Sequence, residues 1–339
     1  MLDLIRLQNF RQFTDTTITP LNRINLFVGQ NNSGKTALLE ALYLLFADQA
    51  HLLHLPSAFR IAHNNDQDNY ENYWKWLFKN QNIQSGFYIK VTGNKIEINL
   101  RGKQSSEYGG VVFFTKSRID EINEAEYIRG RVEFTGQLLQ IKNLASLFKI
   151  SAFNSFGLPA TRAVNSAADV EEFNQLVLIK DGKKRLIDIL KSIEPALTDL
   201  QYSKIGNQPF LYADVGLERF VPVSQMGQGF NRLLRIFADT LLGNSQILII
   251  DEIENGIGFR GLHDVWQGLS TLAIKNNVQI FATTHSYECI QAAHDALSKQ
   301  GTLSHFALHR LSRRGDNIAA TTYDQETLEA ALQAELEVR

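Results

Sequence analysis

The sequence predicts an α/β fold with two lobes, one with a mainly parallel sheet and one that is a mixed antiparallel β lobe. The largely apolar runs 247–250 and 278–282 are typical of parallel strands that are buried on both faces. The β-forming segments 87–91 and 95–100 flank Thr92-Gly93-Asn94, a turn sequence typical of hairpins. The first observation predicts the parallel lobe, and the second predicts the antiparallel one.

Composition limits the classes of protein to which this chain can belong. Its 339 residues are 44% hydrophobic, enough to bury the core of one large domain or two smaller ones. A formal net charge of −2 argues against a protein that coats nucleic acid by bulk electrostatics, although a local basic groove stays open.

The single cysteine, Cys289, excludes an internal disulfide and fits a reducing compartment. The N-terminus carries charges where a signal peptide has an apolar run, and Glu40 interrupts the longest candidate for a membrane span. We therefore expect a cytoplasmic protein without a membrane partner.

The N-terminal residues predict a small β unit followed by a strand, a turn and a helix. Segments 2–8 and 14–19 favour strands and are separated by the turn 9–13, so we expect the two strands to pair. The apolar run 24–28 predicts a third strand, and Ala37–Phe46 predicts an amphipathic helix.

Between that strand and that helix lies Gly29-Gln30-Asn31-Asn32-Ser33-Gly34-Lys35-Thr36, which matches the G-x-x-x-x-G-K-[ST] pattern of a phosphate-binding loop. Glycines permit backbone angles that let main-chain N–H groups surround a polyphosphate, and the helix N-terminus adds partial positive charge. We expect Lys35 to reach the β- and γ-phosphates of ATP and the Thr36 hydroxyl to hold Mg²⁺. The predicted nucleotide-binding residues are Gly29, Asn31, Asn32, Ser33, Gly34, Lys35 and Thr36.

The segment 51–145 has a less regular pattern. Its first part, 51–69, has no clear period and includes a polar run that predicts a solvated loop. Tyr70, Tyr73, Trp74 and Leu77 recur at helical spacing; such a stripe could stack bases, but the packed face of a helix is the commoner reason for it. The strands predicted in the rest of this segment are 87–91, 95–100, 111–114 and 131–134.

The remaining elements are predicted from shorter patterns. Strands are expected at 150–156, 200–205, 210–213 and 220–223, and helices at 170–180, 184–193 and 231–242. The turn 222–230, rich in small residues, precedes the last of these helices. It is either a simple helix cap or a second anion site at a helix N-terminus.

Two carboxylates, Asp251 and Glu252, close the apolar run 247–250. Ligands bind at the carboxyl ends of strands in open α/β sheets, so we expect Asp251 to associate with Mg²⁺ and Glu252 to act on the attacking water. His285 follows the next predicted strand and is expected at the same sheet edge, where a neutral imidazole can hydrogen-bond a phosphate or the water. A purely structural histidine is the alternative.

Four segments stand in order along the chain: GQNNSGKT, SQMGQG, ILIIDEIENG and ATTHS. This order resembles the ABC-type ATPase heads of the SMC, RecF and OLD group. Within that group it resembles the stand-alone AAA15/AAA21-type predicted ATPases, many of which are linked to phage defence. The opening 4–11 and the closing 336–339 are also similar, and the resemblance is weakest over 51–145.

The resemblance implies a role for each segment. Gly29–Thr36 is then Walker A, Asp251 and Glu252 are Walker B with its catalytic glutamate, and His285 is the switch histidine. The signature segment, which acts on the nucleotide of the other subunit, contains Ser224, Gly227 and Gly229. The D-loop region is Glu254-Asn255-Gly256, and the residues implied to approach the base or the phosphates are Asn9, Phe10 and Arg11.

The chain departs from the family pattern in three places. The signature is SQMGQG rather than LSGGQ, and Gly258 stands where relatives often have a histidine that makes dimer contacts. No Q-loop glutamine follows the 51–145 segment, so Arg162 is the substitute candidate. Sustained heptads and room for a TOPRIM nuclease domain after His285 are also lacking, so we expect any such nuclease to be a separate chain.

The expected organisation is a single ABC-like ATPase head over residues 1–339. It comprises an N-terminal β lobe with Walker A (1–50), an insert (51–145), and a lobe with the signature, Walker B and switch (146–339). The expected function is Mg²⁺-dependent ATP hydrolysis by Lys35, Glu252 and His285, with ATP-driven dimerisation that regulates or powers a nuclease or other effector in DNA maintenance or phage defence. The alternatives are a RecF-like repair ATPase that binds DNA, a transporter subunit, and a switch that binds ATP without hydrolysing it.

Overall fold

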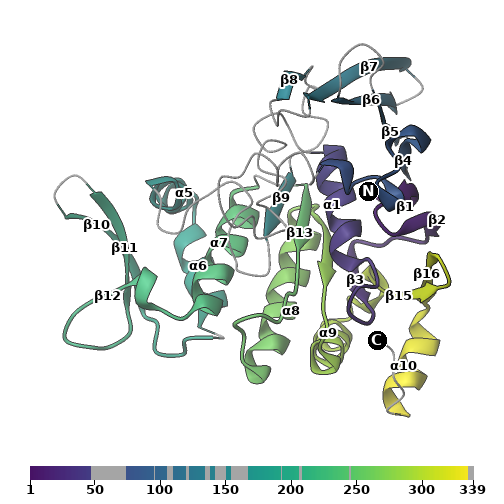
Figure 1. Cartoon of the computed structure of the whole chain (residues 1–339). Helices are drawn as coiled ribbons and strands as arrows, with labels where there is room; N and C mark the ends of the chain where they lie inside the picture. The colour runs from purple at the N-terminus through teal and green to yellow at the C-terminus, as the bar shows by residue number, and fades with distance from the viewer. Residues whose placement is uncertain are drawn as a thin grey trace. The chain divides into compact units, whose positions relative to one another are not determined.

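The computed structural model describes residues 1–46, 74–94, 96–104, 110–119, 122–133, 138–141, 150–153, 167–191, 193–205, 208–243 and 246–334. The chain forms two compact units (Figure 1). The first unit comprises Met1–Phe148 and His305–Arg339, and the second comprises Lys149–Ser304. The expected division at 50 and 145 stays a prediction. The predictions for 51–69, Tyr70, Tyr73, Arg162 and 336–339 lie outside the described residues.

An antiparallel sheet forms much of the first unit. Among the described residues it has seven strands in the order β2-β1-β4-β5-β6-β7-β8. Their bounds are β1 Leu2–Phe10, β2 Phe13–Ile18, β4 Phe87–Gly93, β5 Ile96–Gln104, β6 Gly110–Ile119, β7 Ile122–Glu133 and β8 Leu138–Ile141. The predicted pairing of the first two strands and the predicted hairpin at 87–100 are both confirmed.

The burial pattern explains this sheet. Phe87, Ile89 and Val91 alternate with more exposed residues along β4, so one face of the strand packs into the core. Two short 3-10 turns, η1 Lys79–Gln81 and η2 Ile83–Ser85, precede β4.

The first unit also contains the predicted strand–loop–helix unit, with β3 at Ile24–Val28 and α1 at Lys35–Phe46. All of β3 is buried, and it pairs in parallel with β15 (Phe306–Arg314). That strand pairs antiparallel with β16 (Asn317–Tyr323), and α10 (Gln325–Gln333) follows.

The second unit contains the predicted parallel strands. Strand β13 (Ile247–Ile250) lies between β9 (Ile150–Phe153) and β14 (Gln279–Thr283) and is parallel to both. Its helices are α5 Ala167–Leu178, α6 Gly182–Leu190, α7 Gln228–Leu242, α8 Phe259–Lys275 and α9 Tyr287–Lys299. Helices α8 and α9 pack side by side (Figure 1).

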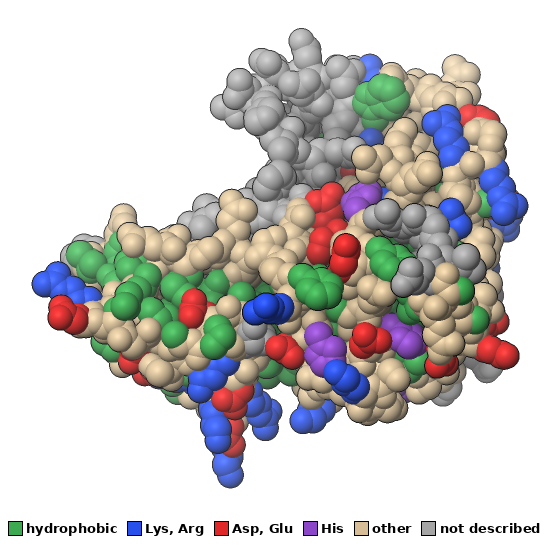
Figure 2. All heavy atoms as spheres, turned by 90° about the horizontal axis from the view of Figure 1, so that it is seen from below, with side chains coloured by type: hydrophobic (Ala, Val, Ile, Leu, Met, Phe, Trp, Pro, Cys, Tyr) green, Lys and Arg blue, Asp and Glu red, His purple; other side chains and the backbone are tan. Residues whose placement is uncertain are grey.

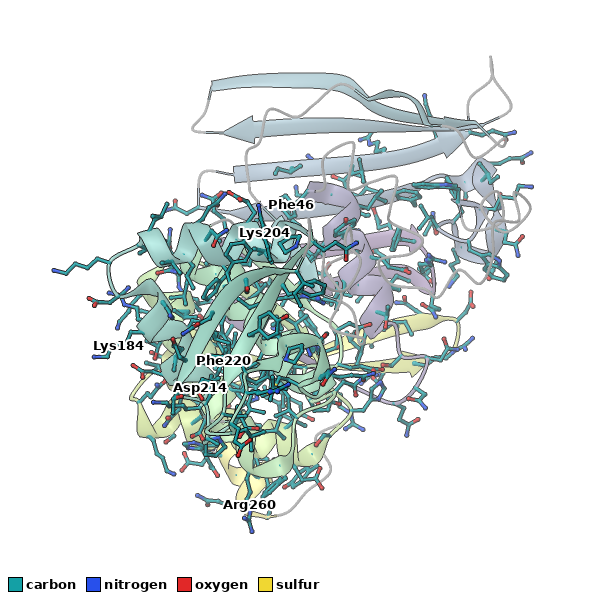
Figure 3. The ribbon with its side chains drawn as sticks, turned by 90° about the vertical axis from the view of Figure 1, so that its left-hand side faces the viewer. Phe46, Lys184, Lys204, Asp214, Phe220 and Arg260 are labelled. Atoms are coloured by element: carbon teal, nitrogen blue, oxygen red, sulfur yellow. The ribbon has the colours of Figure 1, made fainter. Side chains whose placement is uncertain are left out.

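The expected β segments at 200–223 form a separate antiparallel sheet in this unit. Its strands, among the described residues, are β10 Asp199–Ile205, β11 Gln208–Asp214 and β12 Val221–Pro222. Figure 3 labels Lys204, Asp214 and Phe220 on or beside these strands. Hydrophobic side chains gather at the left of Figure 2, the side on which these strands lie in Figure 1, and Ile205 is 63% exposed.

The predicted helices α1, α5, α6 and α7 each begin two or three residues earlier than expected. Helix α7 starts at Gln228, and Gly227, with non-helical backbone angles, serves as its N-cap. Within the part of the chain that the structure describes, we find no helix long and apolar enough to cross a membrane.

Candidate functional site

The predicted phosphate loop connects β3 to α1 in the first unit. The loop turns through left-handed backbone angles at Gly29 (φ 146°), Asn32 (φ 62°) and Gly34 (φ 94°). Ser33 N donates to Gln30 O at 3.2 Å, and the first turn of α1 is closed by Leu38 N donating to Gly34 O at 2.9 Å. The backbone therefore has the tight curvature that brings main-chain N–H groups toward one point.

Two glycines of the loop are required by space as well as by backbone angle. A Cβ on Gly29 would lie 2.2 Å from Leu311 O and 2.6 Å from Ser33 Oγ. A Cβ on Gly34 would lie 2.8 Å from the ring of Phe13. The loop is therefore packed against both β15 and the start of β2, and neither position has room for a side chain.

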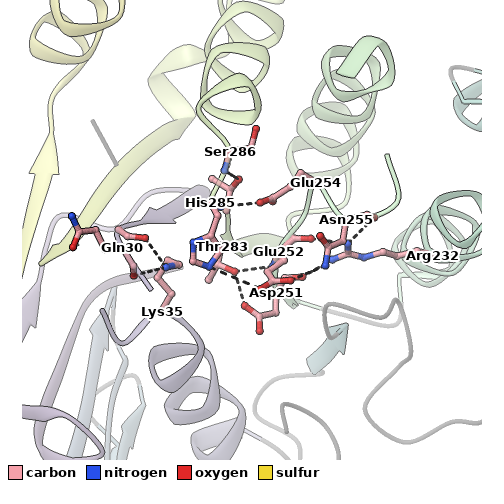
Figure 4. A network of polar contacts seen from close by, with 12 residues as sticks. Gln30, Lys35, Arg232, Asp251, Glu252, Glu254, Asn255, Thr283, His285 and Ser286 are labelled. Carbon is pink, nitrogen blue, oxygen red and sulfur yellow. Dashed lines mark hydrogen bonds and ion pairs between the residues drawn. The ribbon is translucent and has the colours of Figure 1, made fainter. Parts of the chain in front are cut away.

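Lys35 belongs to the loop as well as to the helix. Its ammonium group donates to Gly29 O at 2.7 Å and to Gln30 O at 3.1 Å, and the residue is 5% exposed (Figure 4). The positive charge is thus held beside the loop backbone, where an anionic phosphate would benefit from it.

The turn between β1 and β2 contacts this loop through Gln12 and Phe13, whereas the resemblance implied an approach of Asn9, Phe10 and Arg11 to the base or the phosphates. Gln12 Nε2 donates to Asn32 Oδ1 at 2.7 Å, and Phe13 packs on Gly34. The Arg11 guanidinium instead pairs with the buried Glu40 of α1, with Nε 2.8 Å from Oε2. This pair anchors Arg11 on α1, and the implied approach of Arg11 to the base or the phosphates stays a prediction.

In the second unit, β13 and β14 are adjacent and parallel, so their carboxyl ends meet at one edge. Thr283 Oγ1 donates to Asp251 Oδ1 at 2.6 Å and accepts from Glu252 N at 2.8 Å. Ile253 N also donates to Thr283 O at 3.0 Å. The end of β14 therefore fixes the two carboxylate residues that follow β13.

The Glu252 carboxylate lies between two polar groups of the same unit (Figure 4). Asn255 Nδ2 donates to Glu252 Oε2 at 2.7 Å, and His285 Nε2 is 3.9 Å from Glu252 Oε1. Glu254 accepts a 2.8 Å hydrogen bond from His285 N, which fixes the backbone at the histidine. The structure thus brings together Glu252 and His285, and it leaves both side chains partly exposed.

A buried arginine, which sequence analysis missed, lies behind these residues. Arg232 of α7 is 2% exposed, and its guanidinium donates to the backbone oxygens of Asp251 (2.5 Å), Glu252 (2.7 Å) and Asn255 (3.1 Å). Burial lowers the pKa of Arg232 to about 10, partly opposed by the nearby acidic groups, led by Glu254, so the group stays charged at neutral pH. Its only signal in the sequence is a charged residue within the buried face of a helix.

The signature segment lies around the start of α7 and includes the 3-10 turn η3 (Val223–Gln225). Ser224 and Gly227 are exposed, and a Cβ on Gly227 would meet no atom within 4 Å. Gly229 is buried, and a Cβ there would lie 1.8 Å from Gly256 O. Close packing against the D-loop region therefore explains Gly229, whereas Gly227 faces open space.

Comparisons with known proteins bear on the fold and the family of this chain. A family model described as "AAA domain, putative AbiEii toxin, Type IV TA system" matches residues 24–290. An ATP/GTP phosphatase of Helicobacter pylori is 22% identical over 371 residues, which cover 97% of each protein. The DNA replication and repair protein RecF of Halothermothrix orenii is 30% identical over 145 residues, 42% of this chain and 38% of that protein.

Two solved structures share the fold. An SMC head bound to the C-winged helix domain of ScpA has a TM-score of 0.54 and 11% identity, over 98% of this chain and 99% of that one. An Smc head from Pyrococcus furiosus with an extended coiled coil has a TM-score of 0.51 and 10% identity over the same shares. The expected fold, a P-loop NTPase of the ABC-type head class in the SMC and RecF group, is thus confirmed. Because the family match includes the phosphate loop, Asp251, Glu252 and His285, and spans most of the sequence, this chain belongs to the AAA-domain family described as putative AbiEii toxins.

Proposed function

We propose that this chain is a Mg²⁺-dependent ATPase whose ATP-driven dimerisation regulates or powers a partner protein. The observation that carries the proposal is the oriented carboxylate of Glu252, held by Asn255 and beside His285, in a chain that also has a complete phosphate loop. Membership of an AAA-domain family and similarity to an ATP/GTP phosphatase support nucleotide hydrolysis.

The residues fit ATP and Mg²⁺. The left-handed turns at Gly29 and Gly34 curve the backbone so that its N–H groups can face a phosphate, and Lys35 supplies a positive charge. The Thr36 hydroxyl and the Asp251 carboxylate are oxygen ligands of the kind that Mg²⁺ prefers. When bound, the metal would offset charge on the phosphates.

The chain's own residues then have separate tasks. Lys35 holds the β- and γ-phosphates, and Glu252 accepts a proton from the attacking water or orients it. His285 lies 3.9 Å from Glu252, so its imidazole can share a hydrogen bond with that water or with the phosphate. These assignments predict separable effects on nucleotide binding and on turnover.

The test is a pair of substitutions with matched controls. Lys35→Ala should abolish tight ATP binding, whereas Glu252→Gln should keep binding and reduce turnover by roughly 10²–10³-fold, as for loss of one transition-state contact. The exposed residues Lys299 and Glu326 offer the controls Lys299→Ala and Glu326→Gln, which should match the unsubstituted protein. Near-normal turnover in Glu252→Gln would remove Glu252 from this role.

The partner and the setting are part of the proposal. The exposed start of α7 supports contact with a second subunit, as the signature segment makes in ABC-type heads. An SMC head in a solved structure binds another protein, which supports a search for a separate effector such as a TOPRIM-type nuclease. We place this system in the cytoplasm, in phage defence or DNA maintenance.

A second candidate is a repair ATPase that binds DNA directly, in the manner of RecF. The similarity to RecF over 145 residues favours it. Stimulation of ATP turnover by duplex DNA or DNA junctions would support this candidate, and turnover that is indifferent to DNA would favour the protein-partner proposal.

A further inference from the structure

Arg232 joins α7 to the turn after β13 more firmly than a single contact would. Its two terminal nitrogens donate to Asp251 O, Glu252 O and Asn255 O, three acceptors within one turn (Figure 4). A planar guanidinium presents its donors in a rigid fork, whereas an ammonium group presents them from one freely rotating nitrogen. The conformation of this turn is therefore tied to the position of one helix.

A second contact ties the same two elements. Gly229 packs so closely on Gly256 that a Cβ on Gly229 would lie 1.8 Å from Gly256 O. Both contacts lie in the first two turns of α7, next to the exposed segment Ser224–Gly227. A displacement at the start of α7 would therefore move the turn that carries Glu252.

The turn needs such support. Glu252 has a left-handed backbone (φ 49°), which a residue with a side chain adopts at an energetic cost. The turn also carries three acidic side chains, those of Asp251, Glu252 and Glu254. The positive charge of the Arg232 guanidinium lies near them and offsets their mutual repulsion. Removal of the guanidinium would release the backbone of Glu252 and of Asn255, whose amide orients the Glu252 carboxylate.

We propose that Arg232 is a positioning residue through which α7 sets the conformation of Glu252 for hydrolysis. It acts on the carboxylate only through the backbone of the turn and through Asn255, and it does not contact the nucleotide's phosphates in this role. The inference rests on the proposed ATPase function, and it extends that function by making the start of α7 a control point for turnover.

The first test is a double-mutant cycle on the full chain. Arg232→Lys keeps the charge but loses the planar donor pair, and it should reduce kcat by on the order of 10²-fold, the effect of a small misplacement of a catalytic group. The KM for ATP and the Kd for a fluorescent ATP analogue should stay within twofold. In the Glu252→Gln background, Arg232→Lys should not reduce the residual kcat further, because the group that Arg232 positions is already inactive.

Controls separate positioning from general damage. Arg260→Lys, at the exposed start of α8 (Figure 3), should match the unsubstituted protein in every assay. Equal losses from Arg232→Lys in both Glu252 backgrounds, or a matching loss of nucleotide affinity, would indicate a merely structural role and overturn the inference.

A second variant tests the same link without touching the guanidinium. Gly229→Ala should push α7 away from Gly256 and reduce kcat with little effect on Kd, whereas Ser298→Ala, at an exposed position of α9, should have no effect. Hydrogen exchange of the peptide spanning 251–257 should rise in Arg232→Lys and Gly229→Ala but not in the controls.

The outcomes for the two proposals are distinguishable. Unchanged exchange and unchanged kcat in Arg232→Lys and Gly229→Ala, with Glu252→Gln inactive, would overturn the positioning role and leave the proposed ATPase intact. An unsubstituted protein that does not turn over ATP would overturn both.

Discussion

The side-chain amide of Asn255 donates a 2.7 Å hydrogen bond to Oε2 of Glu252, a residue on the other side of Ile253 and Glu254 in the same turn. The amide nitrogen donates to Oε2 and leaves the other carboxylate oxygen, Oε1, on the side of His285 Nε2, 3.9 Å away. A residue of the D-loop region therefore orients the expected catalytic base within its own unit.

The first prediction concerns this contact. Asn255→Ala should reduce kcat by roughly 10-fold or more, since it removes a hydrogen bond that orients a charged group. Asn276→Ala is the matched control, because Asn276 donates to Thr240 O at 2.6 Å at the end of α8, away from the carboxylates. Initial rates at saturating ATP measure the effect. Equal rates in both variants would contradict the assigned role of Asn255.

A second prediction separates the structural and nucleotide-binding interpretations of Arg11. The Arg11–Glu40 pair is buried, with Nε 2.8 Å from Oε2, so Arg11→Met should lower the free energy of unfolding by about 3–5 kcal/mol by removing the arginine partner of a buried carboxylate. The double variant Arg11→Met with Glu40→Leu should recover most of this loss. Denaturant unfolding measures both.

The exposed pair Arg6–Asp15 provides the control for Arg11. Its ion-pair distance is 2.6 Å, but the two side chains are 42% and 44% exposed, so Arg6→Met should unfold much like the unsubstituted protein. If Arg11→Met instead unfolds like the unsubstituted protein and loses ATP affinity, Arg11 contacts the nucleotide as the family resemblance implied.

The parts of the fold that sequence analysis predicted depend on local patterns. The apolar strands β13 and β14 and the phosphate loop are each specified by a few adjacent residues, so their type and order followed from the sequence. The hairpin at 87–100 was predicted for the same reason, since alternation and turn residues are local.

The parts that were missed depend on contacts between distant residues. Nothing near Arg232 in the sequence indicates that its guanidinium meets the carbonyls after β13, and nothing near Gln12 indicates its bond to Asn32. The hairpin of β15 and β16 was also missed, although its turn at Gly315 (φ 61°) gave a local signal. Site residues in one motif were thus predictable, and the residues that hold them were not.

The third prediction concerns two neighbouring tryptophans of the 51–145 segment. Trp74 is 2% exposed and Trp76 is 52% exposed, so Trp74→Ala should cost about 3–5 kcal/mol of stability and Trp76→Ala less than about 0.5 kcal/mol. We expect both variants, where folded, to keep their affinity for ATP, because neither tryptophan belongs to the phosphate-binding motif Gly29–Thr36. Calorimetric unfolding and ATP titration test the two claims, and a folded Trp76→Ala protein without ATP affinity would contradict the second.

The fourth prediction is a dependence of stability on pH. His309 is fully buried, stacks on Phe27 and lies 3.3 Å from Asn25 Oδ1 and 2.9 Å from Thr322 Oγ1. Burial lowers its pKa from 6.5 to about 3, so the folded state holds the neutral imidazole while the unfolded chain gains a proton below pH 6.5. The contribution of His309 to stability is therefore complete above pH 6.5 and is lost progressively as the pH falls toward 3.

Urea unfolding between pH 7.5 and 4.5 measures this dependence. Each pKa unit corresponds to about 1.4 kcal/mol, so the free energy of unfolding should fall by a few kcal/mol over this range. His309→Gln removes the titrating group and should flatten the curve, even if it lowers stability at pH 7. An equally steep curve in His309→Gln would assign the dependence to other groups.

The last prediction concerns assembly. In the proposed dimer, Ser224–Gly227 of one subunit faces the γ-phosphate bound by the other, and two-fold symmetry repeats the contact. ATP then joins the subunits, and hydrolysis weakens the joint because the bridging phosphate leaves. Glu252→Gln protein should therefore shift toward a dimer, or a higher assembly of dimers, in light scattering with ATP but not with ADP or without nucleotide.

Adding Gly227→Asp to the Glu252→Gln protein should abolish this shift toward a dimer by placing a carboxylate against the phosphate. This change is a clean probe, because a Cβ on Gly227 meets nothing within 4 Å and Asp is a favourable helix N-cap, so the monomer should fold normally. A mass that stays monomeric and indifferent to nucleotide in both proteins would leave an ATPase that acts within one subunit as the better account.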